Sequence, residues 1–307
     1  MRTVFIYAFI VLVSFGLIAC ENGGSADQTE SPTAKRYPFK GEIVKIDKAA
    51  KKATINHEKI EGYMDAMTMD LEIRKPDWVW NELVKGSVVT GDLVVDNAKG
   101  EYWVEVTGVI APQDSSQERS PTAEDKAIIG KKLPAFSLTN QDGKTISPDN
   151  FKGKGLAITF IYAQCPLPAY CILMSKNFSD LANQINAEEE LKNTYRLLSI
   201  SFDPARDTPE KLKSYGIGYL GRGSKATDFV VWQLAVGEDK EVRKIADFAG
   251  LRYEVDEKDK TQFTHSLRTL VVAPDGTIKK VFTGNDWKAE DLLREMKSAM
   301  NAESGEK

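Results

Sequence analysis

The fold of the second half of this chain is decided by one stretch, Leu156-Ala-Ile-Thr-Phe-Ile-Tyr162, and by the loop that follows it, Ala163-Gln-Cys165-Pro-Leu-Pro-Ala-Tyr-Cys171. An unbroken run of apolar and β-branched residues predicts a strand that is buried on both faces of a sheet. Beyond the loop, apolar side chains recur at helical spacing through residues 178–185. The two cysteines therefore lie between a central strand and the helix after it.

Strands and helices alternate around this stretch. Residues 195–202 form a second apolar run, and Asp207-Thr-Pro209 marks the start of a helix. Asp142-Gly143 predicts a turn in an early hairpin, and residues 270–282 predict a late hairpin before a final amphipathic helix. This order predicts a mainly parallel sheet closed by an antiparallel hairpin, which is a thioredoxin-like α/β layout.

Short strands fill the first half of the chain. Alternating or β-branched runs occur at residues 41–47, 52–57, 67–73, 88–95 and 102–110, with no long helix between them. Such a pattern predicts a small closed all-β barrel of the OB-like kind.

The N-terminus has the form of an export signal. One positive charge and an apolar run precede Leu17-Ile-Ala-Cys20, which resembles the bacterial lipobox, in which the cysteine is diacylated. A plain transmembrane anchor is the alternative, but the run is short for spanning a bilayer. We therefore expect a lipid-anchored protein of the cell envelope that faces the periplasm or the exterior, and Glu21 favours the outer membrane weakly.

The predicted divisions follow from these patterns. They are a signal peptide (1–19), a polar tether (20–37), the barrel (38–111), a linker without apolar periodicity (112–127) and the thioredoxin-like domain (128–301). A net charge of −4 argues against a nucleic-acid partner.

The potential soft-metal ligands are few and gathered in local patterns. The chain has 2 His and 3 Cys, and thiolate, thioether and imidazole together select Cu(I). The prolines between Cys165 and Cys171 prevent a continuous helix, so a loop can bring the two thiols together. The following helix N-terminus is expected to lower at least one thiol pKa. His265 lies at a strand end that can face the same loop.

A second group of soft ligands falls in the barrel. Met67 and Met69 are two residues apart on a predicted strand, so both side chains leave the same face. His57, at the end of the preceding strand, can reach across to them. Core packing is the usual role of methionine, but a histidine beside the pair favours a metal site.

The thioredoxin-like half resembles the SCO/SenC family of copper chaperones. The resemblance rests on Phe160-Ile-Tyr-Ala-Gln-Cys165-Pro, Cys171, Ser199-Ile-Ser-Phe-Asp203-Pro with the Asp207-Thr-Pro motif after it, and His265-Ser266. It implies that Cys165, Cys171 and His265 bind copper, as Cu(I) or also as Cu(II), and that the Cys165–Cys171 pair can form a disulfide. It also implies delivery to the copper-site subunit of cytochrome c oxidase or to another copper client.

One departure concerns the loop and one role stays open. The family spacing has three residues between the cysteines and this chain has five, which leaves metal affinity and preferred oxidation state open. Asp203 is expected to help orient the site, or else is an ordinary Asp-Pro strand end.

The barrel half resembles the CusF-type periplasmic copper-binding domain, on Gly41-Glu-Ile-Val, Thr54-Ile-Asn-His57 and Ala66-Met-Thr-Met69. The resemblance implies Cu(I) binding by His57, Met67 and Met69. A Trp that caps the ion in that family is replaced by Met64, which is a candidate third thioether unless the fourth side of the ion stays open.

Three functions remain open. We expect a copper metallochaperone, with the barrel as a Cu(I) capture site, rather than an enzyme. A thiol–disulfide oxidoreductase is the first alternative, including one that reduces the copper-site cysteines of the oxidase. Against it, the spacing is wider than Cys-x-x-Cys, and residues 263–272 contain no Pro. A copper-resistance sink with a structural disulfide is the second alternative.

Overall fold

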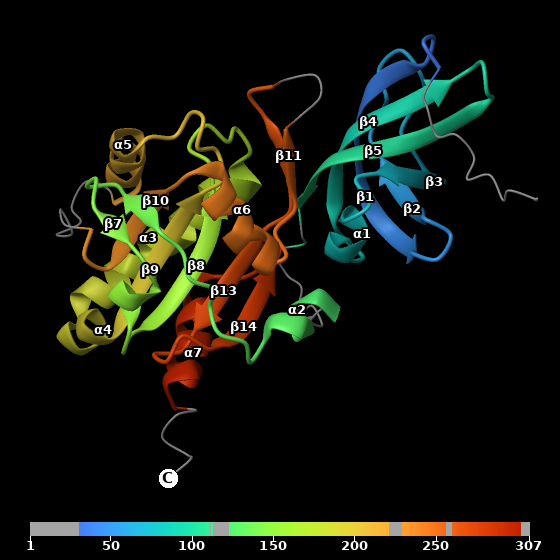
Figure 1. Cartoon of the computed structure of the whole chain (residues 1–307). Helices are drawn as coiled ribbons and strands as arrows, with labels where there is room; N and C mark the ends of the chain where they lie inside the picture. Colours follow the sequence, from blue (N-terminus) through green and yellow to red (C-terminus); the bar gives the residue numbers. More distant parts are fainter. Residues whose placement is uncertain (1–30, 111, 113–122, 221–228, 256–259, 302–307) are drawn as a thin grey trace, which may run out of the picture.

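A computed structural model describes residues 31–110, 112, 123–220, 229–255 and 260–301, and these form two parts that lie side by side (Figure 1). The predicted signal peptide 1–19, the lipidation site Cys20 and residues 20–30 of the tether fall outside the described residues. Among the residues described, no helix is long and apolar enough to cross a membrane.

The first part is a closed barrel with the strand order β1-β2-β3-β5-β4, which confirms the OB-like expectation. Along residues 39–43 and 52–57, buried residues alternate with more exposed ones, because successive side chains point to opposite sides of the wall. The strands are β1 (Lys35–Asp47), β2 (Lys52–His57), β3 (Met67–Lys75), β4 (Val88–Asp96) and β5 (Glu101–Ile110), with one short helix, α1 (Val79–Glu82), after β3.

Strand β1 begins at Lys35, three residues before the predicted start of the barrel. Its first residues pair with the end of β4, where Lys35 lies opposite Val95. Just ahead of the strand, the Ser31 hydroxyl donates a hydrogen bond to the buried Asp96 carboxylate at 2.7 Å. The polar composition of this segment gave no sign of a strand, because a partner more than 50 residues away supplies the pairing.

The second part is a three-layer α/β domain that contains every predicted strand and helix and some that were not predicted. Its elements are α2 (Ala123–Ile128), β6 (Leu138–Asn140), β7 (Thr145–Ile146), η1 (Pro148–Phe151), β8 (Gly155–Ile161), η2 (Pro168–Ile172), α3 (Leu173–Ala187), α4 (Glu189–Thr194), β9 (Tyr195–Ser201), α5 (Pro209–Leu220), β10 (Trp232–Val236), α6 (Asp239–Phe248), β11 (Tyr253–Val255), β12 (Phe263–His265), β13 (Arg268–Val272), β14 (Ile278–Thr283) and α7 (Ala289–Asn301).

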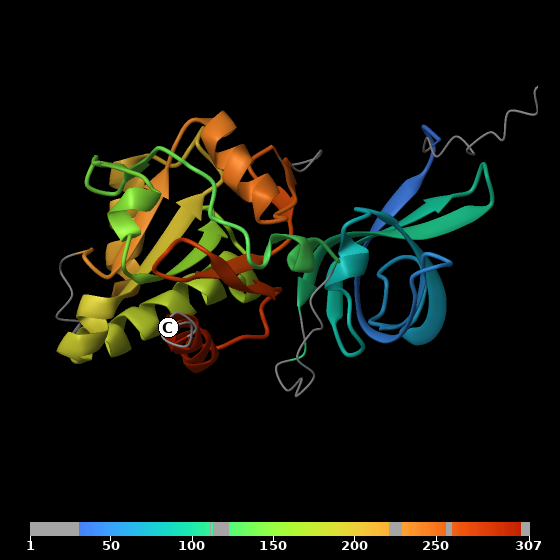
Figure 2. The ribbon, with the colours of Figure 1, turned by 60° about the horizontal axis from the view of Figure 1, so that its bottom comes forward.

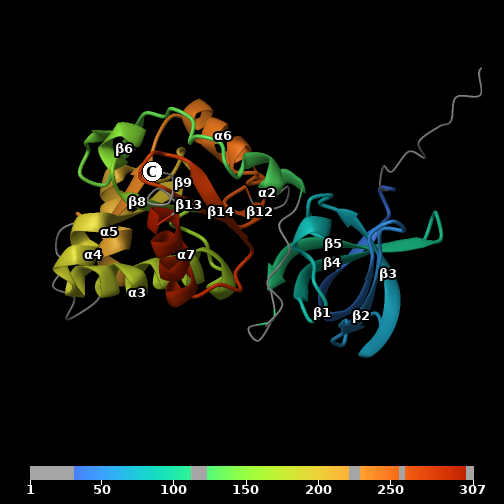
Figure 3. The ribbon, with the colours of Figure 1, turned by 90° about the horizontal axis from the view of Figure 1, so that it is seen from below.

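Its main sheet has the order β14-β13-β8-β9-β10-β6-β7. Strands β8, β9 and β10 are parallel, and β13 runs antiparallel to β8, as a thioredoxin-like core requires. Every residue of β8 is buried, because α3 and α7 cover one face of the sheet and α6 lies on the other (Figures 2 and 3). The predicted turn at residues 142–143 closes the β6–β7 hairpin, with Gly143 at φ 73°.

Each part has its own apolar core, and the two cores do not merge. A buried ion pair connects the two parts. Arg268, at the start of β13, is buried and donates from Nη1 to Glu82 Oε1 of the barrel helix α1 at 2.6 Å. Its Nε lies 3.8 Å from Asp125 Oδ1 on α2. One buried guanidinium therefore links the barrel, the connecting segment and the sheet.

The last residues of the predicted linker, 112–127, form most of the short helix α2. Asp125 is buried there, where it accepts a hydrogen bond from Thr283 at 3.2 Å and faces Arg268. The segment lacks apolar periodicity because ionic contacts hold the helix in place. A search for amphipathic patterns does not detect such contacts.

Candidate metal centre

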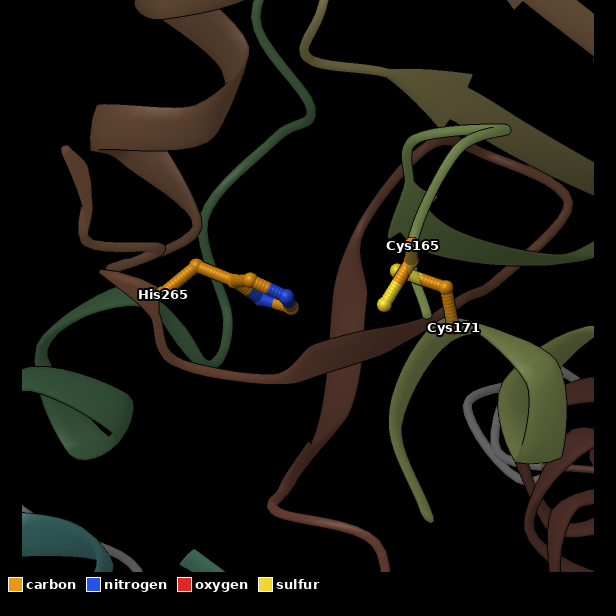
Figure 4. Close-up of side chains that lie close together, drawn as sticks. All are labelled: Cys165, Cys171 and His265. Carbon is orange, nitrogen blue, oxygen red and sulfur yellow. The ribbon is translucent and has the colours of Figure 1, made fainter. Parts of the chain in front are cut away.

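Three side chains that are far apart in the sequence converge at the carboxyl end of β8. Cys165 lies in the loop after β8, Cys171 lies in the turn that precedes α3, and His265 ends β12. One potential ligand atom from each lies within 4.8 Å of the others, and all three residues are buried. The His265 ring points towards the two sulfur atoms (Figure 4). The sequence grouped these residues, and the structure brings all three together.

The tautomer of His265 is fixed by its neighbour. Nδ1 lies 2.8 Å from the carbonyl oxygen of Ser266. A carbonyl oxygen only accepts hydrogen bonds, so Nδ1 carries the proton and Nε2 keeps its lone pair. Nε2 is buried and has no hydrogen-bond partner. A buried lone pair without a partner is costly unless something binds there, and a neutral imidazole nitrogen fits a metal ion.

Aromatic rings enclose the histidine. The ring centroids of Tyr162, Tyr170 and Phe202 lie 5.8, 5.3 and 5.0 Å from that of His265. These rings were not among the predicted site residues, because Tyr162 and Phe202 end apolar runs and Tyr170 offers no soft metal ligand. The rings limit the directions in which His265 can move and leave its Nε2 facing the cysteines.

Both cysteines are free thiols in this structure, so the predicted disulfide stays a prediction. A hydrogen bond from Cys171 places the pKa of Cys165 well below its usual value. Burial and the neighbouring Cys165 raise the pKa of Cys171. One thiolate and one thiol therefore share a proton. The expected low thiol pKa falls on Cys165, and its main cause is the hydrogen bond from the second thiol.

Two acidic residues, Asp207 and Asp203, lie beside the segments that carry these three side chains. Asp207 Oδ2 accepts hydrogen bonds from the Ala163 amide at 2.9 Å and from the Ser201 hydroxyl at 2.6 Å. It thereby fixes the start of the cysteine loop. The sequence placed Asp207 only at the start of a helix, and its contact with the loop could not be read from local spacing.

Among the described residues, Asp203, the predicted orienting residue, makes no direct hydrogen bond to Cys165, Cys171 or His265. Arg206 Nε donates to its Oδ2 at 2.5 Å, and Arg206 Nη1 donates to the Thr261 carbonyl, just before β12. Burial raises the pKa of Asp203, although Arg206 opposes that shift. An influence on His265 would therefore pass through Arg206 and strand β12.

The barrel reaches this centre through Tyr170. The hydroxyl of Tyr170, in the cysteine loop, accepts a hydrogen bond from the Val109 amide of β5. A cavity of about 10 Å³ lies between the two parts, with room for about one water molecule. Its lining includes His265 and Tyr170 from one part and Trp78 and Glu82 from the other. The role of Trp78 at this boundary was not foreseen.

The second predicted group lies at one end of the barrel. His57 pairs with Met67 across strands β2 and β3, and Met69 is the next residue on the same face. His57 is buried, whereas Met67 is 50% exposed. Met64 and Met69 pack against the barrel core. The His57 Nδ1 lies 2.7 Å from the Glu58 carbonyl oxygen, and its Nε2 is buried without a partner, so this ring also keeps a lone pair available.

Comparison with known proteins gives matches to both parts. The SCO1/SenC family profile matches residues 124–301, and the profile of the copper binding periplasmic protein CusF matches residues 36–101. The SCO1 protein homolog of Bacillus subtilis strain 168 is 28% identical over 178 residues, which cover 57% of this chain and 86% of that protein.

Two solved structures are also similar. A SCO1/SenC family lipoprotein from Bacillus anthracis is 26% identical with a TM-score of 0.47, over 55% of this chain and 95% of that one. Yeast Sco1 with copper bound is 20% identical with a TM-score of 0.45, over 56% of this chain and 92% of that one.

Proposed function

Because this chain belongs to the SCO1/SenC family, we propose that it is a copper-binding metallochaperone whose cargo is held by Cys165, Cys171 and His265. The observation that carries this proposal is the convergence of these three buried side chains within 4.8 Å. The unpartnered Nε2 of His265 supports it further. Two sulfur atoms and one imidazole nitrogen form the donor set that suits Cu(I), and the imidazole also suits Cu(II).

The thiol pair is prepared for a soft metal ion. Because the pKa of Cys165 is lowered, this residue is already a thiolate at neutral pH. Cys171 gives up its proton when the metal binds, because a coordinated thiol is deprotonated. The buried position keeps water from competing for the metal, and the loop between the cysteines gives both sulfur atoms room to adjust.

The barrel is the proposed capture site for Cu(I). His57 and Met67 face each other across paired strands, and Met69 follows on the same side. The match to the CusF profile over residues 36–101 supports this role. Met64 lies in the loop that precedes β3 and forms a bridge with Ile60, from where it is the candidate for a third thioether.

The proposed setting is the outer face of a membrane of the cell envelope, with Cys20 as the lipid attachment point. Its support is the lipobox-like sequence that ends the N-terminal apolar run. The proposed client is the copper-site subunit of cytochrome c oxidase or another copper protein of the envelope. This part of the proposal rests on the resemblance to the SCO/SenC family.

A thiol–disulfide oxidoreductase is the second candidate, and the shared proton of the thiol pair favours it. In that reaction the Cys165 thiolate attacks a client disulfide to form a mixed disulfide, and Cys171 then attacks the Cys165 sulfur and displaces the client thiol. The client gains two electrons and two protons as a dithiol, and Cys165–Cys171 is left as a disulfide. The copper-site cysteines of the oxidase are a client to which both candidates apply.

The test is the Cu(I) stoichiometry of the reduced chain under anaerobic competition with a chromogenic chelator. Two equivalents are expected. His265→Ala removes one of them, and Met67→Ala with Met69→Ala removes the other. Each of the two histidines serves as the control for the other, because His57→Ala must leave the cysteine site loaded. A single equivalent that does not respond to His265→Ala contradicts the metallochaperone proposal and favours the thiol–disulfide reaction.

A further inference from the structure

Tyr170 occupies an unusual position between the two parts of the molecule. It lies in the cysteine loop, next to Cys171, and is buried. Its ring stands edge-on to His265, with 5.3 Å between the centroids. The loop has five residues between its cysteines, which gives it the length to place this side chain beside the histidine and against the barrel at once.

The barrel has a matching recess for the Tyr170 hydroxyl. Strand β5 pairs with β3 only at Val104 and Glu105 in the described part of the chain, so its last residues have an open side. There the Val109 amide donates to the Tyr170 oxygen. A side chain at Gly108 would close the recess, because its Cβ would lie 3.4 Å from the Tyr170 hydroxyl and 2.7 Å from Thr90 Oγ1.

Other contacts hold the barrel in this place. The buried Glu82–Arg268 pair connects α1 to β13, three residues after His265. Strand β12, which ends at His265, lies against β5. The cavity of about 10 Å³ beside His265 shows how closely the two parts approach. The barrel therefore covers His265 on the side away from the cysteines.

From these contacts we infer that Tyr170 is a positioning residue through which the docked barrel holds the cysteine loop and His265 together, and so slows the release of Cu(I). The inference rests on the proposed function. When the barrel is docked, the Tyr170 ring is fixed at its hydroxyl end by the barrel and at its edge by the His265 ring. When the barrel moves away, the loop loses this support, and the three ligands can separate more easily.

The test measures how fast a chelator removes Cu(I) from the full chain. A His57→Ala background removes the barrel site, so that the signal comes from the cysteine site alone. Tyr170→Phe keeps the ring beside His265 and removes the hydroxyl that accepts a hydrogen bond from the Val109 amide. We expect about fivefold faster removal, which corresponds to the loss of one buried hydrogen bond. Tyr195→Phe is the matched control. Tyr195 is also a buried tyrosine, but it is the first residue of β9 and so lies at the end of the sheet away from the cysteine loop.

A second variant acts from the barrel side without changing the cysteine domain. Gly108→Val combined with Thr90→Ala fills the recess and pushes against the Tyr170 hydroxyl, and Thr90→Ala alone is its control. The Gly108→Val/Thr90→Ala variant should raise the rate of Cu(I) removal by at least about fivefold relative to Thr90→Ala alone. Thermal unfolding of each variant shows whether the chain still folds, and a purely structural role would change unfolding without changing the removal rate.

The inference is overturned if removal stays within twofold of the controls in both variants. It is also overturned if only Tyr170→Phe has an effect, since the barrel would then play no part. If the parent chain takes up no Cu(I), the proposed function fails, yet docking can still be tested. An aromatic disulfide reagent then labels the reduced cysteines without metal, and both variants should be labelled about fivefold faster than their controls. Unchanged labelling contradicts the docking role.

Discussion

Glu82→Gln is the most direct test of the joint between the two parts. The Glu82 carboxylate lies 2.6 Å from Arg268 Nη1, and the side chains are 5% and 2% exposed. Removing one partner of a buried pair typically costs about 3–5 kcal/mol, because the other charge is left without compensation. Asp125 Oδ1, 3.8 Å from Arg268 Nε, still compensates part of the charge. We therefore expect the lower end, about 3 kcal/mol.

The assay is urea unfolding of the full chain, monitored by tryptophan fluorescence and far-UV circular dichroism. Because the pair connects two separate cores, its loss should also separate the unfolding of the barrel from that of the α/β domain. Glu101→Gln is the control, since the same chemical change there affects an exposed pair with Arg74, at 45% and 16% exposure. Exposed pairs contribute about 0–1 kcal/mol. If Glu82→Gln destabilises the protein no more than Glu101→Gln does, the buried pair does not hold the parts together.

Three further outcomes follow from the structure. Asp207→Asn removes the carboxylate that accepts a hydrogen bond from the Ala163 amide, so a thiol reagent should label the cysteine loop faster than in the wild type. Equal labelling rates in the variant and the wild type would show that other contacts fix the loop. Phe178→Ala in the core of α3 should lower the unfolding free energy by about 3–5 kcal/mol, and a loss under 1 kcal/mol would contradict its buried packing. Burial raises the pKa of Glu105, but hydrogen bonds and charge, chiefly from Arg36, outweigh it and lower the pKa overall. Its stabilisation is therefore present above the unfolded pKa of about 4.3 and is lost as pH falls through the lower folded value; the stability gap between the wild type and Glu105→Gln should close below about pH 4, and a gap independent of pH would refute this.

The sequence predicted the secondary structure best where one face of an element is buried along its whole length. Strand β2 begins and ends at the predicted residues, and the buried runs at β8 and β9 lie within one residue of prediction. Residues 178–185 were correctly assigned to a helix that packs on the sheet. In these segments local periodicity and tertiary burial agree, so the pattern is informative.

Only the three proposed ligands of the candidate site were picked out from the sequence, and the structure brings them together. Cys165, Cys171 and His265 were recognisable because thiols and imidazoles are rare in this chain. Tyr170 and Arg268 were missed, since their roles depend on contacts with residues 61 and 186 positions away. Tyrosine and arginine are common residues, and neither stands out until the chain has folded.

Both histidines are oriented by the residue that follows them. His57 Nδ1 bonds to the Glu58 carbonyl, and His265 Nδ1 bonds to the Ser266 carbonyl. Each ring therefore takes its tautomer from its own short piece of backbone and needs nothing from the other half of the protein. Either half would therefore present its imidazole in the same tautomer beside a different neighbouring domain, because the hydrogen bond that sets the tautomer is made between two consecutive residues.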